Sequence, residues 1–232
     1  TPPSGQSLQD LKRFDRTNSA INRKCTGEKF SGNFLNWASS SAVDMLRLAL
    51  SGGDRYIDTP TLTILQRAVL PDSSVSTNFW NGTNFPSKNL TRAGKSGAND
   101  FWGAIPDSMR ATAGNNNISI ANDNNKIYFR AGTKQGTTNA SANNYTLGSS
   151  GTIKLNTDGF FYARVQVCNT DNSGVLLDNR DYQLCKQYPA GNYKPIGAIQ
   201  KYSNQLRLAA FGYMSQSKNN SAGGATFGGV LR

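Results

Sequence analysis

Two short stretches of oxygen-bearing side chains could hold a cation, and they are the first candidates for chemistry in this sequence. Asp72, Ser74 and Ser76 follow the pattern Asp-x-Ser-x-Ser, which gathers the hard oxygen ligands that a divalent cation requires. Such a loop should follow a buried strand, whereas Pro71 and a helical pattern precede this one. Because a serine-rich chain also produces this pattern by chance, the three residues are kept as candidates and no metal is assigned.

The second stretch runs from Asn169 to Gly174 and resembles the first half of a calcium-binding loop. Oxygen donors stand at alternate positions, and a glycine stands where the loop would bend. Asp178 could add a carboxylate, but Arg180 occupies the position where a calcium loop needs a bidentate glutamate. We interpret this stretch as a structural turn, and we expect no cofactor in this chain.

The chain contains no histidine. Catalytic triads, imidazole general bases and histidine-ligated metal sites are therefore excluded. Glu28, Asp100, Asp107 and Asp158 are not spaced as a carboxylate pair for glycosidic chemistry, and no glycine-rich phosphate loop precedes a Lys-Ser/Thr helix. The sequence predicts a protein that is not an enzyme.

The chain is strongly basic, with 25 Lys and Arg against 14 Asp and Glu and a formal net charge of +11. This excess predicts attraction to polyanions such as nucleic acid, acidic glycans or an anionic membrane. Basic residues cluster near the amino terminus and alternate with tyrosines farther along, which suits contacts with single-stranded nucleic acid or sugars. The candidate contacts are Lys12, Arg13, Arg16, Arg23, Lys24, Lys29, Lys186, Lys194 and Lys201. The alternative is that they are solvated residues that keep an asparagine-rich surface soluble.

Three cysteines cannot all pair with one another inside the chain. Cys168 and Cys185 flank a turn-rich segment, so a disulfide between them would close a short loop and indicate an oxidising compartment. Cys25 would then need a partner outside this sequence. The alternative is three buried free thiols in a cytosolic protein.

The longest segment with a helical period runs from Phe30 to Gly53. Its apolar residues recur at three- and four-residue steps and predict one helix with a broad face buried in the core. Ser31 or Asn33 could cap its start, and Gly52 with Gly53 would end it. A second, short helix is predicted after Pro60, with Leu62 to Val69 forming its amphipathic pattern.

Asn, Gly, Ser and Thr dominate residues 72–159. Two segments there, 118–120 and 126–130, alternate as strands do and flank a turn signal, so they predict a hairpin. We interpret the region as a polar loop-and-hairpin insertion laid over a core made elsewhere.

The remaining elements come from the end of the chain. A strand is predicted from Phe160 to Cys168, a helix from Pro195 to about Asn204, and a buried central strand from Leu206 to Tyr213. A helix followed by such a strand is half of an α/β unit, so the predicted fold class is mixed α/β. We predict a single domain over 1–232 that is a fragment of a larger protein, with core helices at 30–71, the insertion at 72–159, and core strands and a helix at 160–232. No apolar run is long enough to cross a membrane.

Several segments, in order along the chain, resemble one known family. They are Phe30 to Ala38, Ser51-Gly-Gly-Asp-Arg55, Thr63 to Ala68, Arg164 to Cys168, Cys185 to Pro189, Lys194 to Tyr202, Leu206 to Tyr213 and Gly228 to Arg232. They resemble the PilC/PilY family of type IV pilus tip adhesins, which includes the competence-associated ComC proteins. The matches cover both ends of the chain and skip its asparagine-rich middle.

The resemblance implies a fragment of a large secreted bacterial protein with a von Willebrand A-like amino-terminal half and a calcium-binding propeller outside this chain. The expected fold is an incomplete or modified von Willebrand A-like core, in which the helix at 30–53 packs on the strand at 206–213. The expected function is attachment to a host or abiotic surface from the pilus tip, with support for pilus assembly and natural transformation. The expected partners are minor pilins, reached through the rest of the protein. The alternative is a DNA-binding tip module that acts in DNA uptake through its basic surface.

Overall fold

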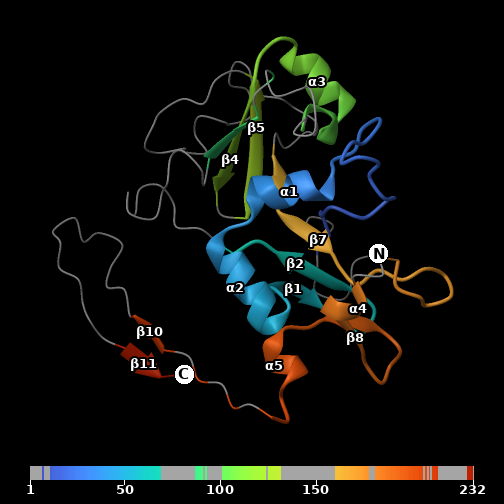
Figure 1. Cartoon of the computed structure of the whole chain (residues 1–232), viewed down its shortest axis with the longest axis vertical. Coiled ribbons are helices and arrows are strands. Elements are labelled where there is room, and N and C mark those ends of the chain that lie inside the picture. Colours follow the sequence, from blue (N-terminus) through green and yellow to red (C-terminus); the bar gives the residue numbers. More distant parts are fainter. Residues whose placement is uncertain are drawn as a thin grey trace.

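The computed structural model describes residues 7, 11–68, 87–90, 92, 101–123, 125–131, 160–177, 181–205, 207, 209, 211–213 and 229–231. Short helices and small sheets alternate along the described chain (Figure 1). The helices are α1 (Gly32–Ser39), α2 (Ala42–Ser51), the 3-10 turn η3 (Trp102–Ala104), α3 (Asp107–Ala113), α4 (Asp181–Leu184) and α5 (Ala198–Lys201). The strands are β1 (Arg55–Asp58), β2 (Thr63–Gln66), β3 (Ser87–Leu90), β4 (Ile118–Asp123), β5 (Lys126–Ala131), β6 (Phe161–Tyr162), β7 (Arg164–Gln166), β8 (Cys185–Gln187), β9 (Tyr193–Pro195), β10 (Phe211–Tyr213) and β11 (Gly229–Leu231). The mixed α/β class predicted from the sequence is confirmed.

The segment predicted as one helix over 30–53 forms two helices, so this prediction is wrong in its middle. Ser40 and Ser41 are extended and separate α1 from α2. Ser41 caps α2, because its hydroxyl accepts from the Asp44 N–H while the Asp44 carboxylate accepts from the Ser41 N–H. The predicted end is confirmed, since Gly52 adopts the left-handed conformation with φ +82° that ends a helix at low steric cost.

The short helix predicted after Pro60 is also wrong, because Thr63–Gln66 is strand β2. β2 is the central strand of a three-stranded antiparallel sheet in the order β1-β2-β7. Thr63 and Ile64 are buried there. Pairing on both edges together with the β-branched side chains favours the strand over the local helical pattern.

The second sheet forms the floor of the main hydrophobic core and has the order β3-β4-β5-β6. Its β4–β5 pair is the hairpin predicted at 118–130. Helix α1 covers this sheet with Phe34 and Ala38, which pack against the hairpin residues Ile118, Ile120 and Phe129. Residues 90–129 therefore contribute much of this core. They lie within the region 72–159, whose composition predicts an insertion laid over a core made elsewhere. Helix α3, which the sequence did not predict, adds Met109 and Ala113 to the same core.

The strand predicted from Phe160 to Cys168 is present but divided between the two sheets. β6 pairs with β5, and β7 pairs with β2. Ala163 lies between them, and its N–H donates to the Asn125 carbonyl while its carbonyl accepts from the Arg67 N–H, at 2.8 and 2.9 Å. This residue therefore couples the two sheets.

The chain after β7 forms a disulfide-linked module. Cys168 and Cys185 are bonded, with 5.9 Å between their Cα atoms, as predicted, and Cys25 is a free thiol. β8 and β9 form an antiparallel pair. Pro195 ends β9 instead of opening the predicted helix, and α5 begins at Ala198.

The predicted central strand at 206–213 is not found beneath the helix at 30–53. Its residues Phe211–Tyr213 form β10, which pairs antiparallel with β11 in a two-stranded sheet at the lower left of Figure 1. All pairings between the named strands are antiparallel, whereas an α/β unit places its strands in parallel. The von Willebrand A-like arrangement is therefore not confirmed. No helix in the described parts of the chain is long and apolar enough to cross a membrane.

Candidate functional site

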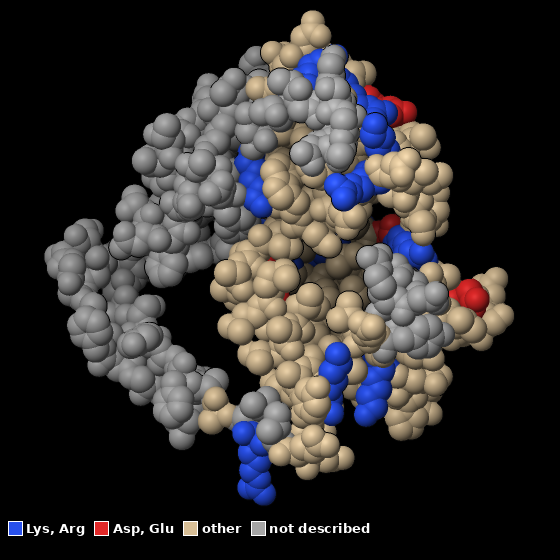
Figure 2. Space-filling view, in the orientation of Figure 1, with Lys and Arg blue, Asp and Glu red and all other residues tan. Residues whose placement is uncertain are grey.

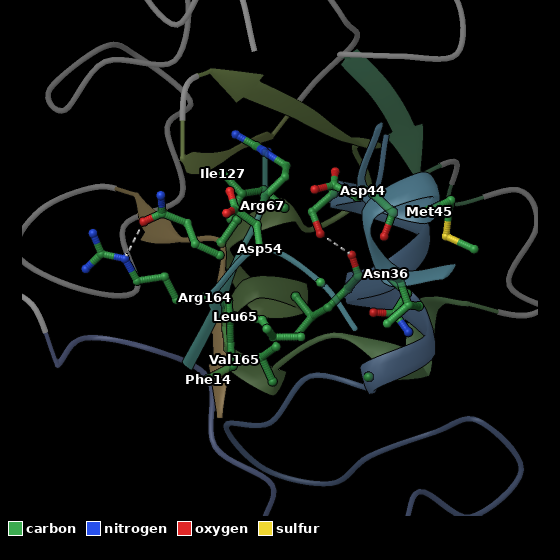
Figure 3. Close-up of a pocket in the computed structure, with 18 residues that line it drawn as sticks. Phe14, Asn36, Asp44, Met45, Asp54, Leu65, Arg67, Ile127, Arg164 and Val165 are labelled. Atoms are coloured by element: carbon green, nitrogen blue, oxygen red, sulfur yellow. Dashed lines mark hydrogen bonds between the residues drawn. The ribbon is translucent and has the colours of Figure 1, made fainter. Parts of the chain in front are cut away.

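A groove lies between helices α1 and α2 and the β1-β2-β7 sheet. Its volume is about 210 Å³. Apolar side chains of Phe14, Leu65 and Val165 form one wall, and the helices contribute Asn36 and Met45 on the opposite side (Figure 3). The groove can therefore accept an apolar group. Whether it also supports catalysis depends on the polar side chains at its rim.

Both carboxylate oxygens of Asp44, at this rim, accept hydrogen bonds from the protein. One carboxylate oxygen accepts from the Ser41 N–H at 2.9 Å and from the Ser41 hydroxyl at 2.7 Å. The other oxygen accepts from the Ala68 N–H at 2.6 Å, just beyond strand β2. Asp44 thus caps helix α2 and ties it to the sheet. The sequence pattern Ser41-x-x-Asp44 is a capping-box signal that could have located this break between the helices.

Gln66 and Arg164 form a second polar pair at the groove. The Arg164 Nε donates to the Gln66 Oε1 at 2.8 Å, a bond drawn as a dashed line in Figure 3. The buried guanidinium also lies 3.7 Å from the ring centroid of Tyr56 and 4.4 Å from that of Tyr162. Cation–π contacts with both rings fix the arginine in place.

Arg67 connects the two sheets through the interior. Its guanidinium donates to the Asn122 side-chain oxygen and, at 2.9 Å, to the Lys126 carbonyl. Asn122 in turn donates to the Ala38 carbonyl in α1 at 2.7 Å. Both side chains are buried, so this chain of hydrogen bonds joins the residue after β2 to β4, β5 and α1 within the core.

A second site of close contact joins α2 to the disulfide-linked module, and two glycines allow it. A Cβ atom on Gly52 would lie 2.6 Å from the Pro195 carbonyl carbon, and one on Gly197 would lie 2.3 Å from the Leu50 carbonyl carbon. Both clashes are with backbone, which cannot rotate away. The backbone of α2 and the segment from β9 to α5 therefore touch directly.

Charged side chains surround this glycine contact. The Arg55 guanidinium donates to the Pro195 carbonyl at 2.7 Å and to the Asp58 carboxylate at 2.9 Å. The Lys194 ammonium also binds Asp58 and donates to the Thr59 carbonyl at 2.8 Å. Burial alone would raise the pKa of Asp58, but the hydrogen bonds from Lys194 and Arg55 outweigh it and hold this pKa below its usual value.

A half-exposed aromatic cluster lies at the far edge of α1. The rings of Trp37 and Phe101 are nearly parallel, with centroids 6.5 Å apart. The Lys88 ammonium lies 4.9 Å from the Trp37 ring centroid, and burial lowers the pKa of Lys88. The desolvated lysine is compensated by the ring face and by the Trp37 carbonyl, to which it donates.

The nine basic candidates are not gathered at one place. Arg13 pairs with Asp15 and donates to Gln166 at 2.9 Å, and Lys194 is engaged at Asp58. The other seven are exposed and lie on the 12–29 segment, on β8 and on α5: Lys12, Arg16, Arg23, Lys24, Lys29, Lys186 and Lys201. Figure 2 shows Lys and Arg in separate groups over the face in view. Two of the nine candidates therefore hold the fold, and the rest are dispersed over the surface.

The cation candidates gain no support. Asp72, Ser74 and Ser76, like Asp178 and Arg180, lie outside the described residues. In the stretch from Asn169 to Gly174, the Asp171 carboxylate accepts from the N–H groups of Ser173 and Val175 at 2.8 and 2.9 Å, as a structural turn requires. The described residues contain no group of three or more His, Cys, Asp or Glu side chains that could hold a metal ion.

These features define a small mixed α/β domain whose polar side chains, where described, mainly tie its elements together. A family model described as "PilY1 homolog, small alpha/beta domain" matches residues 8–142. The chain belongs to this PilY1 homolog family.

Two relatives carry the same name, type IV pilus biogenesis factor PilY1 homolog, and both come from Xylella fastidiosa (strain Temecula1 / ATCC 700964). One is 30% identical over 201 residues, which cover 86% of this chain and 15% of the relative. The other is 44% identical over 59 residues, or 25% of this chain and 4% of the relative. The chain thus spans a small part of each relative. No solved structure matches it.

The pairing of Asp58 predicts a pH-dependent contribution to stability. Because its pKa is lowered in the folded chain, the contribution is present above the unfolded pKa and is lost as the pH falls through the folded pKa. We expect Asp58→Asn to lower the free energy of unfolding by roughly 1 kcal/mol or less at pH 6, since the pair is partly exposed. Thermal unfolding of both proteins between pH 6 and pH 2.5 should show this difference shrinking at low pH.

Asp15→Asn is the matched control, because it removes a carboxylate from another arginine pair away from this contact. A wild-type advantage over Asp58→Asn that stays constant down to pH 2.5 would contradict the assignment.

Proposed function

We propose that this chain is a non-enzymatic interaction domain of a type IV pilus protein. The observation that carries the proposal is the family match over residues 8–142, together with relatives named as type IV pilus biogenesis factors. The described site residues agree with it. Asp44, Gln66, Arg164 and Asp58 are engaged with neighbouring protein groups, and none is arranged as a nucleophile with its base.

The proposed role is attachment. The domain acts at the bacterial cell surface or pilus tip after export through the periplasm, and it supports pilus assembly and natural transformation. The two coupled sheets and the Cys168–Cys185 bond give a stiff scaffold that presents polar loops to a host cell or an abiotic surface. Minor pilins are contacted through other parts of the protein. A disulfide accords with an oxidising compartment such as the periplasm.

The test is genetic and uses the full-length protein. In the source strain, an in-frame deletion of the region corresponding to this chain should reduce surface pili, attachment to an abiotic surface, or both. Gly32→Ala serves as a control, because a Cβ there meets no atom within 4 Å. Wild-type piliation and attachment in a deletion strain that still makes and exports the shortened protein would overturn the proposal.

The alternative role, DNA capture by basic residues, is favoured by the net charge of +11. It predicts an electrophoretic shift of duplex or single-stranded DNA that weakens steeply between about 50 and 200 mM salt, as phosphate contacts require. Replacing Lys12, Arg16 and Lys29 together by Gln should weaken the shift, whereas replacing Lys186 alone should matter less. Absence of a shift even at the lowest salt would eliminate this role.

A further inference from the structure

Helix α2 carries its apolar side chains on the wrong side for a core helix. All residues of α2 are apolar except Asp44, Arg47 and Ser51. No residue of this helix is buried. The side chains of Met45 and Leu46 are each 58% exposed. A helix of this composition is normally covered on most sides.

This exposure follows from which side of α2 faces the rest of the protein. Asp44, Leu48 and Ser51 are partly covered and face the body of the protein, where Asp44 binds the Ala68 N–H. The opposite side repeats at three- and four-residue steps and is apolar along its whole length: Ala42, Val43, Leu46, Ala49 and Leu50. The side of α2 that carries Asp44, Leu48 and Ser51 thus faces the protein, and an apolar side faces outward.

Helix α5 extends this apolar surface. The Gln200 amide donates to the Ser51 carbonyl at 3.2 Å, and Gly197 packs on the Leu50 backbone, so α5 is held beside the end of α2. Ile199 and Tyr202 of this segment are about half exposed. We define the α2–α5 ridge as Val43, Leu46, Leu50, Ile199 and Tyr202.

Positive charge flanks the α2–α5 ridge. Arg47 in α2 and Lys201 in α5 are exposed, and the exposed Arg207 follows Tyr202 by five residues. Figure 2 shows Lys and Arg side chains at the lower end of the face in view, below the uncharged surface of the helices. Asp54 is the acidic neighbour, and it is already paired with Arg47.

These features select among the occupants that could cover the ridge. A second copy would bring a chain of net charge +11, with the same basic flank, against its like. The ridge residues do not line the groove described above, which opens on the side of α2 that carries Asp44 and Leu48. An anionic lipid surface needs no shape match, accepts aliphatic side chains, and attracts the basic flank. Tyr202, with an apolar ring and a polar hydroxyl, suits the interface between headgroups and acyl chains.

We propose that the α2–α5 ridge binds the chain reversibly to an anionic lipid surface, with the aliphatic side chains inserted among the acyl chains and Arg47, Lys201 and Arg207 at the headgroups. This does not depend on the proposed pilus role. The interaction is peripheral, because the described helices are too short to cross a bilayer.

The test is co-sedimentation of the 232-residue chain with vesicles of phosphatidylcholine alone or mixed with phosphatidylglycerol. We expect binding to the mixed vesicles at about 50 mM salt, weaker binding at about 300 mM salt, and little binding to phosphatidylcholine alone. Leu46→Glu should reduce binding to the mixed vesicles about tenfold or more, because it places a carboxylate at the centre of the ridge.

Val175→Glu is the matched control. Val175 is 48% exposed, so it is an aliphatic residue of similar exposure, but it lies in the disulfide-closed loop away from the ridge. This variant should bind like the wild type, and circular dichroism should show that both variants remain folded. No binding of the wild type to mixed vesicles at the lower salt concentration overturns the proposal, as does equal loss of binding in the two variants. Formation of a dimer that Leu46→Glu disrupts would assign the ridge to a second copy instead.

Discussion

The arrangement of this domain depends on a direct backbone contact between helix α2 and the segment that joins β9 to α5. Gly52 and Gly197 provide it from opposite sides, because neither position leaves room for a Cβ atom. Once the two backbones meet, Arg55 can reach the Pro195 carbonyl, Gln200 can reach the Ser51 carbonyl, and Lys194 can reach Asp58. The disulfide bonds the start of β8 to the chain just beyond β7, so the same module is attached to the sheet at a second point.

This contact gives a structural meaning to two of the segments that resemble the PilC/PilY family. Ser51-Gly-Gly-Asp-Arg55 and Lys194 to Tyr202 lie far apart in the sequence but meet here. Three charged residues lie around this contact: Arg55, Asp58 and Lys194. They bind one another and nearby carbonyl groups. In these two segments the charged side chains therefore hold the domain together.

Local signals in the sequence are sufficient for some elements. The β4–β5 hairpin follows from alternation around a turn, the end of α2 from two glycines, and the Cys168–Cys185 bond from the turn-rich segment between the two cysteines. Other elements depend on distant partners. Strand β2 has a helical pattern in isolation and is decided by pairing with β1 and β7. The outward apolar face of α2 reverses the usual rule, because Asp44 is held inward by Ser41 and Ala68. The local pattern of α2 therefore predicts the wrong side as the covered one.

The close approach at Gly197 can be tested by hydrogen–deuterium exchange of the wild-type chain, Gly197→Ala and Gly32→Ala. Gly32 starts α1, and a Cβ atom added there would meet no other atom within 4 Å, so its substitution controls for the loss of a glycine. We expect Gly197→Ala to speed exchange in both α2 and residues 193–201, and Gly32→Ala to leave both segments protected. Wild-type protection of residues 193–201 in Gly197→Ala would contradict the claim that this backbone contact holds the module to the helices.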